Sequence, residues 1–336
     1  MAIPVIAFFN NKGGVGKTSL VYHIAWMLSE LGWNVLAADL DPQANLTGAF
    51  LDEDRLEELW QQGQQIPNTI YRMVQPLVKG VGDVSNTPRL EKIEQRLTLL
   101  AGDLALSGFE DQLSEVWPKC MDGDERSFRV ISSLWRALQS AAEIVDASVI
   151  LMDLGPNLGA INRSALIASD YIVVPLTPDL YSLQGLRNLG PTLRHWRNDW
   201  KERVPRNPAE DLLLPPGRMK TIGYIVMQHA VRLDRPVKAY MRWIAQIPGT
   251  YCKDVLDEEI CDEREITQDP NCLALLKNYQ SLMPMAQEAH KPMFHLKPAD
   301  GALGAHGKAV TNAFNDFRKL TKKILEAAGI HSMALS

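Results

Sequence analysis

The sequence predicts a doubly wound α/β fold, with a mostly parallel sheet flanked by helices on both faces and carrying helical insertions. Short apolar runs alternate along the chain with stretches of helical periodicity, which is typical of β-α-β units. The runs are apolar at successive positions, as expected of strands that are buried on both faces. The first run breaks into the polar and glycine-rich residues Asn10–Gly14, so a loop is expected to join the first strand to the first helix.

The elements follow from these runs in order along the chain. Strands are expected at Ile3–Phe9, Trp33–Asp39, Leu97–Ala101, Ala147–Asp153, Asp170–Leu176 and Thr221–Met227. The first helix is expected over Ser19–Leu31, where leucine, isoleucine and methionine recur at helical spacing. Gly32 follows directly, in the place where a glycine commonly ends a helix.

Three stretches interrupt the alternation. Residues 52–96 are helical in pattern and rich in glutamine, with breaks at Pro67 and Pro76. Residues 196–216 hold four prolines and predict a long surface connection, and residues 252–278 are acidic in their first half. A chain of 336 residues has room for about two domains of roughly 150 residues each. Because no stretch has the composition of a linker, we expect one domain over residues 1–336, with these stretches as insertions.

Composition restricts the class of protein. The chain is 46% hydrophobic and 22% charged, as in folded globular proteins, so it is not a disordered chain. Its apolar runs are far shorter than the ~20 residues of a membrane-spanning helix. The four cysteines form no Cys-x-x-Cys pair, which predicts reduced thiols in a cytoplasmic protein. The net charge of −5, taken alone, argues against binding to nucleic acid.

The strongest functional signal is the sequence Lys-Gly-Gly-Val-Gly-Lys-Thr at Lys12–Thr18, between the first strand and the first helix. Glycines let backbone N–H groups close around a phosphate, and the start of the helix adds the positive end of its dipole. Lys17 is expected to reach the outer phosphates, while Lys12 takes the place of the first glycine of the ordinary motif and adds a second cation. The residues predicted to bind the phosphates are Gly13, Gly14, Val15, Gly16, Lys17, Thr18 and Ser19.

Acidic residues end two of the predicted strands. Asp39 and Asp41 close the second strand, and Asp153 closes the fourth. Because the carboxyl ends of parallel strands face the crevice where ligands bind, these side chains are expected beside the phosphate loop. We predict that Thr18, Asp39 and Asp153 hold Mg²⁺ and that Asp41 orients the attacking water. Lys12, Lys17 and Asp41 are then the predicted catalytic residues.

Together these motifs carry a family resemblance. The chain resembles the deviant Walker A ATPases of the ParA/MinD class, a group of P-loop proteins, and within that class it looks most like the ParA-type partition ATPases. The resemblance covers most of residues 3–195 and returns more weakly at 219–230 and 281–328. The segments that carry it are Lys12–Thr18, Asp39–Gln43, Gly102–Leu106, Ile150–Asp153, Asn157–Gly159, Asn162, Ala165–Leu166, Ser169–Pro175 and Ser182–Leu186.

The resemblance implies a specific kind of switch. Proteins of this class bind ATP with Mg²⁺ and form a homodimer in which the lysine equivalent to Lys12 reaches the partner's nucleotide. They hydrolyse ATP slowly, and a ParB-like activating protein accelerates the reaction. Asp39–Asn45 would be the first switch segment and Asp153–Gly159 the second. The resemblance also implies binding to non-specific duplex DNA, a role in DNA partitioning, and a cytoplasmic, nucleoid-associated location.

Three departures from the family pattern modify these expectations. Leu154-Gly155-Pro156 replaces the usual Cys-Pro-Pro, which predicts a looser second switch segment. Only two residues precede the first predicted strand, so we expect an activating partner to dock elsewhere than on an N-terminal arm. Met227–Ala230 replaces the usual polar motif beside the adenine, which leaves the contacts to the base open.

Charge is distributed unevenly along the chain. Residues 187–242 contain 12 basic and 5 acidic residues, whereas residues 251–270 contain 2 basic and 8 acidic residues. The net charge therefore does not exclude DNA, because backbone phosphates can be bound by a local basic surface. The acidic stretch could repel DNA, receive a basic partner segment or be a plain solvated loop. The residues predicted to contact DNA are Arg194, Arg197, Arg232, Arg235, Lys238, Lys319, Lys322 and Lys323.

Two alternative functions stay open at this point. The same switch could position or regulate a protein cargo instead of DNA. It could also be a MinD-like membrane-associated protein, because the C-terminal residues Phe314, Phe317, Leu320 and Ile324 form an apolar stripe beside lysines. We favour packing of this stripe on the sheet over membrane binding. The sequence does not identify the activating partner, the cargo or the kind of DNA molecule served.

Overall fold

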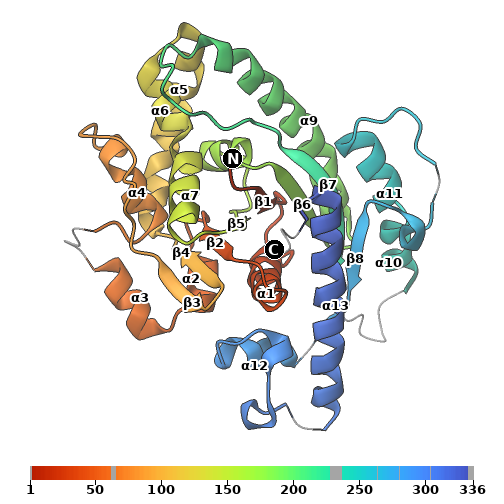
Figure 1. Cartoon of the computed structure of the whole chain (residues 1–336). Coiled ribbons are helices and arrows are strands. Elements are labelled where there is room, and N and C mark those ends of the chain that lie inside the picture. Colours follow the sequence, from red (N-terminus) through yellow and green to blue (C-terminus); the bar gives the residue numbers. More distant parts are fainter. Residues whose placement is uncertain are drawn as a thin grey trace.

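The molecule is built around an eight-stranded sheet with the strand order β3-β4-β2-β5-β1-β6-β7-β8 (Figure 1). The computed structural model describes residues 2–61, 66–227, 237–262, 264–279, 281–302 and 304–331. All strand pairs are parallel except the antiparallel pair of β3 with β4. The strands are β1 (Val5–Phe8), β2 (Val35–Asp39), β3 (Glu91–Glu94), β4 (Leu97–Leu100), β5 (Val149–Asp153), β6 (Tyr171–Leu176), β7 (Lys220–Met227) and β8 (Cys272–Leu276). All six strands predicted from apolar runs are confirmed.

Both edge strands were missed. β3 is polar and pairs only with β4, so it has no run of apolar residues to reveal it. β8 lies inside the stretch 252–278 that we expected to be an insertion, and it extends the parallel sheet beside β7. The predicted connection at 196–216 is also wrong in its first part, because a long helix continues to Arg203 before the chain becomes irregular.

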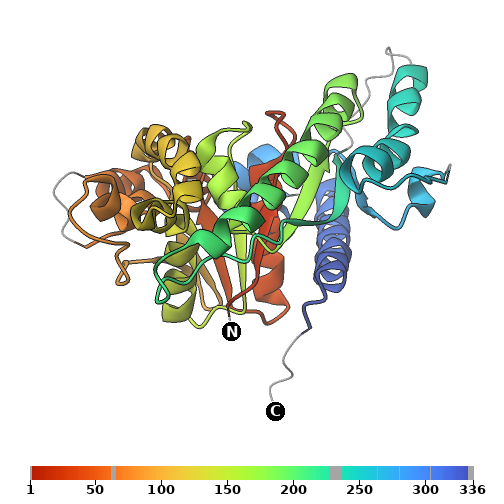
Figure 2. The same cartoon turned by 90° about the horizontal axis from the view of Figure 1, so that it is seen from above.

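Helices cover both faces of the sheet, as Figure 2 shows from above. One face packs against α1, α2, α3, α12 and α13, and the other packs against α4 to α9 together with α10 and α11. The helices are α1 (Lys17–Glu30), α2 (Asn45–Phe50), α3 (Glu53–Trp60), α4 (Ile70–Val78), α5 (Glu110–Lys119), α6 (Glu125–Ile131), α7 (Ser133–Ile144), α8 (Ala160–Ile167), α9 (Leu180–Arg203), α10 (Val237–Ile244), α11 (Ile247–Thr250), α12 (Leu282–Glu288) and α13 (Ala305–Ala328). The doubly wound fold is therefore confirmed.

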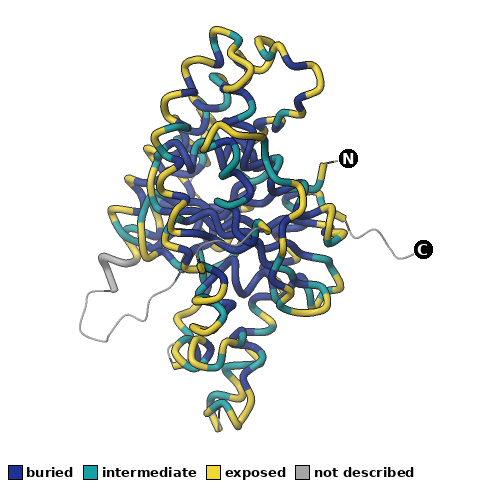
Figure 3. The backbone as a smooth tube through the Cα atoms, turned by 90° about the vertical axis from the view of Figure 1, so that its left-hand side faces the viewer, coloured by how far each residue is buried: buried dark blue, intermediate teal, exposed yellow. Residues whose placement is uncertain are grey.

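The buried residues form two cores, one on each face of the sheet, and Figure 3 shows them at the centre of the chain trace. The apolar stripe of α13 belongs to one of these cores, where Phe317, Leu320 and Ile324 are almost fully buried. This packing is the arrangement that we favoured over membrane binding. In the described part of the chain, no helix is both long enough and apolar enough to cross a bilayer.

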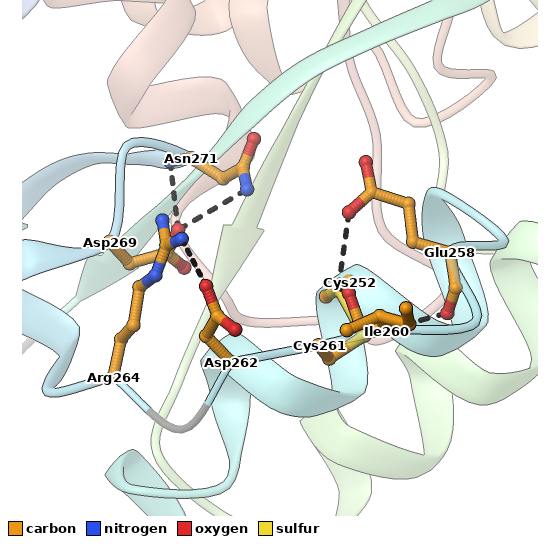
Figure 4. The surroundings of a disulfide bond; sticks show 8 residues. All are labelled: Cys252, Glu258, Ile260, Cys261, Asp262, Arg264, Asp269 and Asn271. Carbon is orange, nitrogen blue, oxygen red and sulfur yellow. Dashed lines mark hydrogen bonds and ion pairs between the residues drawn. A yellow bond between two sulfur atoms is a disulfide. The ribbon is translucent and has the colours of Figure 1, made fainter.

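The cysteines differ from the prediction of four thiols. Cys252 and Cys261 form a disulfide, shown with its surroundings in Figure 4, whereas Cys120 and Cys272 are free and buried. The sequence contained no local signal for this pair, because the cysteines are nine residues apart and only a folded-back chain brings them together.

A glycine in α9 allows a turn of backbone to approach that helix very closely. A Cβ atom built on Gly190 would lie 1.8 Å from the carbonyl oxygen of Asp254, in the turn that carries Cys252. Arg194, one turn further along α9, donates a hydrogen bond of 3.0 Å to the same oxygen. No side chain fits at position 190 without moving backbone.

We predict that Gly190→Ala destabilises the protein. The gain in helix propensity is about 1 kcal/mol, and the displacement of a packed backbone costs more, about 1–3 kcal/mol in similar overpacked sites. Chemical denaturation measures the difference in unfolding free energy. Gly307→Ala in α13 is the matched control, because a Cβ there meets nothing within 4 Å, and it should stabilise slightly. Equal stability of the two variants would contradict the close approach.

Candidate nucleotide-binding site

The predicted site residues meet where β1, β2 and β5 end. In the parallel register Phe8 of β1 and Asp39 of β2 both lie opposite Asp153 of β5. The loop after β1 and the start of α1 complete this edge. A pocket of about 920 Å³ opens there, lined by the phosphate loop, the first switch segment and part of α12. The volume is within the range of small-molecule and cofactor sites in proteins.

The phosphate loop has the backbone conformation that its glycines allow. Gly14 has a φ of 71° and Gly16 a φ of 82°, both in the left-handed region that favours glycine. Gly16 is the residue immediately before α1, and no side chain caps the N-terminus of this helix. The first N–H groups of α1 therefore point toward the pocket without an internal acceptor, as a phosphate site requires.

Lys17 is held inside the loop. Its ammonium donates to the carbonyl oxygens of Asn10 and Lys12, at 3.2 and 3.3 Å. Burial lowers the pKa of Lys17, and the carboxylates of Asp153 and Asp41 oppose that shift. Lys17 is thus a desolvated cation whose hydrogen-bond acceptors are two neutral carbonyl oxygens. A phosphate oxygen would be a stronger acceptor than either.

Lys12 binds residues of its own chain. Its ammonium donates to the hydroxyl of Thr177 at 2.7 Å and pairs with the carboxylate of Asp179. Asp179 also caps α9 by accepting from the N–H of Ser182 at 2.9 Å. Burial raises the pKa of Asp179, but the hydrogen bonds from Lys12 and Thr177 bring it below its usual value. We missed both partners of Lys12, although Asp-x-x-Ser before a helical pattern is a recognisable cap.

Asp39 is fully buried, and both of its carboxylate oxygens accept hydrogen bonds. One oxygen accepts from the N–H and the hydroxyl of Thr47, at 2.8 and 2.7 Å, and the other accepts from the N–H of Asp41. Burial raises the pKa of Asp39 to about 6 against these hydrogen bonds. A Cβ on Gly102 would lie 2.9 Å from the Asp39 carboxyl carbon, which explains why a glycine follows β4. Asp39 thus positions the first switch segment, and its predicted contact with Mg²⁺ stays a prediction.

Asp153 is fully buried, and neither of its carboxylate oxygens makes a hydrogen bond of normal geometry in the described chain. Burial, followed by the charge of Asp39, raises its pKa to about 8, and the hydroxyl of Thr18 offsets part of this shift. A buried carboxylate without partners is costly unless a cation or a proton satisfies it. Asp153 and Thr18 therefore fit a Mg²⁺ ion that takes its other ligands from phosphate and water.

No cluster of three or more His, Cys, Asp or Glu side chains in the described ranges is arranged to hold a metal ion by itself. A Mg²⁺ site supplied only by protein carboxylates is therefore not what these ranges offer. A site completed by nucleotide phosphates agrees with the usual behaviour of this ion.

The second switch segment is anchored at several points. Asn162 donates to the carbonyl oxygens of Gly155 and Asn157, at 2.9 and 2.7 Å. Glu110 of α5 accepts from the N–H groups of Ala160 and Ile161 at the start of α8. These contacts oppose the looser segment that we expected from its unusual sequence. Gly155 also lets Asp41 come close, because a Cβ there would lie 3.2 Å from an Asp41 oxygen.

The far wall of the pocket was not predicted. It is formed by Tyr22 and His23 of α1, Trp60 of α3, and Met283 and Gln287 of α12. Burial lowers the pKa of His23 to about 4, so the imidazole is neutral near pH 7 and hydrogen-bonds the backbone of Ser19. Of the segment Met227–Ala230 that we considered for base contacts, only Met227 lies within the described residues.

The residues predicted to contact DNA lie in three settings. Arg194 and Arg197 on α9 donate to backbone carbonyl oxygens, so both guanidinium groups already have partners. Lys319 and Lys322 are exposed on the outer side of α13, and the exposed Lys323 donates to the carbonyl oxygen of Cys272 in β8 at 3.5 Å. Arg232 and Arg235 lie outside the described residues, and Lys238 belongs to α10, where only its backbone is described.

A scan against protein-family models matches residues 3–205 to the AAA_31 family, described as an AAA domain. The match spans more than half of the chain and includes the phosphate loop, both switch segments and the cap of α9. The chain belongs to this family. Its relatives also confirm the resemblance to ParA-type partition ATPases that the motifs predicted.

Curated relatives of this AAA_31 protein include PomZ, a cell division protein of Myxococcus xanthus, which is 32% identical over 57% of this chain and 52% of its own length. The sporulation initiation inhibitor Soj of Bacillus subtilis is 30% identical over 56% of this chain and 64% of its own length. The chain thus spans about half to two thirds of the length of these two relatives.

Solved structures show the same fold over nearly the whole chain. A protein of Corynebacterium diphtheriae superposes with a TM-score of 0.70 at 22% identity, covering 97% of this chain and 98% of its own. An ATP complex of a McdA variant from Cyanothece gives a TM-score of 0.62 at 14% identity, covering 99% of both chains. At these identities the likeness establishes the fold.

We predict that the two buried carboxylates make the nucleotide-free protein less stable as pH rises. Their raised pKa values mean that between about pH 4 and 8 the folded state binds more protons than the unfolded state. The free energy of unfolding therefore falls across this window. Asp153→Asn should flatten the fall and be more stable than the wild type at pH 8, by about 2 kcal/mol.

Urea denaturation at several pH values measures this effect. Asp122→Asn, which changes an exposed carboxylate, is the control and should retain the wild-type slope. If Asp153→Asn shows the same pH dependence as the wild type, the buried carboxylate is not the source of it.

Proposed function

We propose that this chain is a Mg²⁺-dependent ATPase that acts as a dimerising switch and positions DNA, with weak intrinsic turnover stimulated by a ParB-like protein. The observation that carries the proposal is the convergence of the glycine loop, the desolvated Lys17 and Thr18 on one pocket of about 920 Å³. The carboxylate of Asp153 is buried behind this pocket, where it interacts with Lys17 and Thr18. The phosphates of a nucleoside triphosphate would supply negative charge for Lys17, and the bound Mg²⁺ would supply positive charge for Asp153. Two structures of the same fold are consistent with this choice, the ATP complex of the McdA variant and a plasmid partition protein of Borrelia burgdorferi bound to AMPPNP.

Each residue has a separate task in the proposed hydrolysis. The N–H groups at the start of α1 and the ammonium of Lys17 bind the outer phosphates. Thr18 and Asp153 would hold Mg²⁺, which neutralises charge on the phosphates. Asp41 is only 6% exposed and lines the pocket, and in the proposed reaction its carboxylate would accept a hydrogen bond from the attacking water.

Dimerisation would give Lys12 a second position. In the single chain its ammonium pairs with Asp179, and both side chains are about a third exposed. Such a pair contributes about 1 kcal/mol or less, so a phosphate of the partner's nucleotide would be a stronger acceptor for Lys12. The lysine can therefore be released at small cost when two nucleotide-loaded chains meet.

DNA binding is proposed for the outer face of α13 first. Lys319 and Lys322 are exposed there, away from the buried apolar stripe, whereas Lys323 donates to the carbonyl oxygen of Cys272 at 3.5 Å. Arg194 and Arg197 already bind carbonyl oxygens, so they are weaker candidates. A protein that binds non-specific DNA in this way would be found with the nucleoid in the cytoplasm.

A protein cargo is the second candidate function. It is favoured by the relative that is named for cell division instead of DNA partition. In that case the same ATP switch would position a protein complex, and the exposed lysines of α13 would only be solvated charges.

We predict that Asp41→Ala retains ATP binding and loses hydrolysis, by about 100-fold or more in kcat, because a positioned base typically contributes 10²–10⁴-fold. Phosphate release measures turnover, and a fluorescent ATP analogue measures binding. Lys17→Ala serves as the contrast, since it should lose binding as well, on the order of 100-fold. Normal turnover by Asp41→Ala would exclude Asp41 as the residue that orients water.

We further predict salt-sensitive binding of non-specific duplex DNA with ATP and little binding with ADP. Lys319→Ala combined with Lys322→Ala should weaken binding and reduce the slope of log K against log salt by about 2, because each lost phosphate contact removes about 0.9. Fluorescence anisotropy of a labelled duplex measures both quantities. The control replaces two exposed lysines elsewhere, Lys79→Ala with Lys92→Ala. If the ATP-loaded protein ignores DNA at low salt, the protein-cargo function replaces the DNA function.

A further inference from the structure

A second hollow lies far from the nucleotide site, at the β8 end of the molecule. It is a groove of about 910 Å³ between α10–α11 and residues 261, 262 and 264–267. Ile244 and Ile266 are buried at its base, while Met241 at its edge is 55% exposed. The groove therefore offers apolar surface to solvent, which a folded chain usually covers or uses for binding.

One side of this groove is acidic, whereas α10 on the other side carries Lys238 and Arg242. The described residues 251–262 and 264–270 contain seven acidic and two basic side chains, a balance of −5. Arg264 lines the groove but pairs with Asp262 at 2.6 Å, so those two charges compensate each other. Glu259 and Glu265 are exposed and form no ion pair within the described chain, and Glu265 lines the groove directly.

The disulfide holds the acidic wall of the groove. Cys261 is the first residue of that wall, and its bond to Cys252 ties it to the turn Tyr251–Val255 (Figure 4). Residues 257–260 between them are exposed, and Ile260 is 85% exposed, so burial contributes little to their position. The covalent bond is therefore a main constraint on where the wall stands.

The turn Tyr251–Val255, which carries Cys252, is firmly packed. It lies against α9, where Gly190 admits the backbone of Asp254 and Arg194 binds the carbonyl oxygens of Asp254 and Val255. Arg194 also pairs with Asp257 at 3.2 Å. Cys252 is thus attached to a fixed support, and Cys261 is attached to Cys252.

We propose that this groove is a docking site for a basic peptide segment of a partner protein, with an apolar side chain that enters beside Met241. The Cys252–Cys261 disulfide holds the acidic wall in the binding position. Charge complementarity selects this occupant, because the uncompensated carboxylates repel the phosphates of DNA and of lipid headgroups. The site is independent of the proposed ATPase activity and uses none of its residues.

The disulfide makes docking dependent on redox conditions. Dithiothreitol transfers two electrons and two protons to the Cys252–Cys261 bond, which yields two thiols and the cyclic disulfide of the reagent. After reduction, Cys261 loses its covalent link to the turn on α9. The wall residues then sample more positions, and binding must order them again at an entropic cost.

The experiment measures binding of a short fluorescein-labelled peptide of repeated Lys-Leu-Ala triplets to the full oxidised chain. The same peptide with Glu in place of Lys is the ligand control. Glu259→Lys combined with Glu265→Lys should weaken binding about tenfold, and Met241→Asp should also weaken it. Glu53→Lys with Glu57→Lys is the matched control, because these exposed residues lie on α3 at the opposite end of the sheet (Figure 1). Circular dichroism confirms that each variant is folded.

Reduction of the wild type should weaken peptide binding severalfold. Cys252→Ser combined with Cys261→Ser should bind at the reduced level and should not respond to dithiothreitol. The docking site is overturned if the acidic peptide binds as well as the basic one, or if reversal of Glu259 and Glu265 leaves binding unchanged. The role of the disulfide is overturned if the oxidised and reduced proteins bind the peptide equally.

Discussion

Two buried carboxylates lie side by side where β2 and β5 end, and their burial is the main constraint on the nucleotide site. Asp39 and Asp153 are register partners in the parallel sheet, and both are fully removed from solvent. The chain satisfies one of them with Thr47 and the N–H of Asp41 and leaves the other without a hydrogen bond of normal geometry. The unequal treatment separates their roles, because Asp39 holds the first switch segment while Asp153 is available to a cation.

The phosphate loop is tied to the opposite side of the sheet through β6 and α9. Asn10 donates to the carbonyl oxygen of Pro175 at 2.7 Å, and Lys12 pairs with Asp179, which caps α9. The loop also lies close to Gly185 of α9, where a Cβ would lie 2.8 Å from the side-chain oxygen of Asn11. A displacement of the loop would therefore disturb the contacts at the start of α9. Further along, this helix supports the turn that carries Cys252.

The surface of the molecule separates charges that nearly cancel in the net value of −5. Exposed lysines lie on the outer side of α13, and uncompensated carboxylates lie around the groove beside α10 and α11. Under the two proposals, duplex DNA would bind the first surface and a basic segment of a partner protein would bind the second. Because the two surfaces are separate, one partner would not block the other.

The sequence by itself determined the fold class, six of the eight strands in the described residues and the position of the phosphate-loop motif. These features depend on local spacing, because apolar runs mark buried strands and glycines at set positions permit a loop that binds phosphate. Tertiary structure alone decided which carboxylate lacks a hydrogen bond of normal geometry, that Lys12 pairs with Asp179, that α12 lines the pocket, and that Cys252 bonds to Cys261. These features depend on strand order, register and close backbone approach between residues far apart in the chain. Spacing along the sequence carries no record of such contacts.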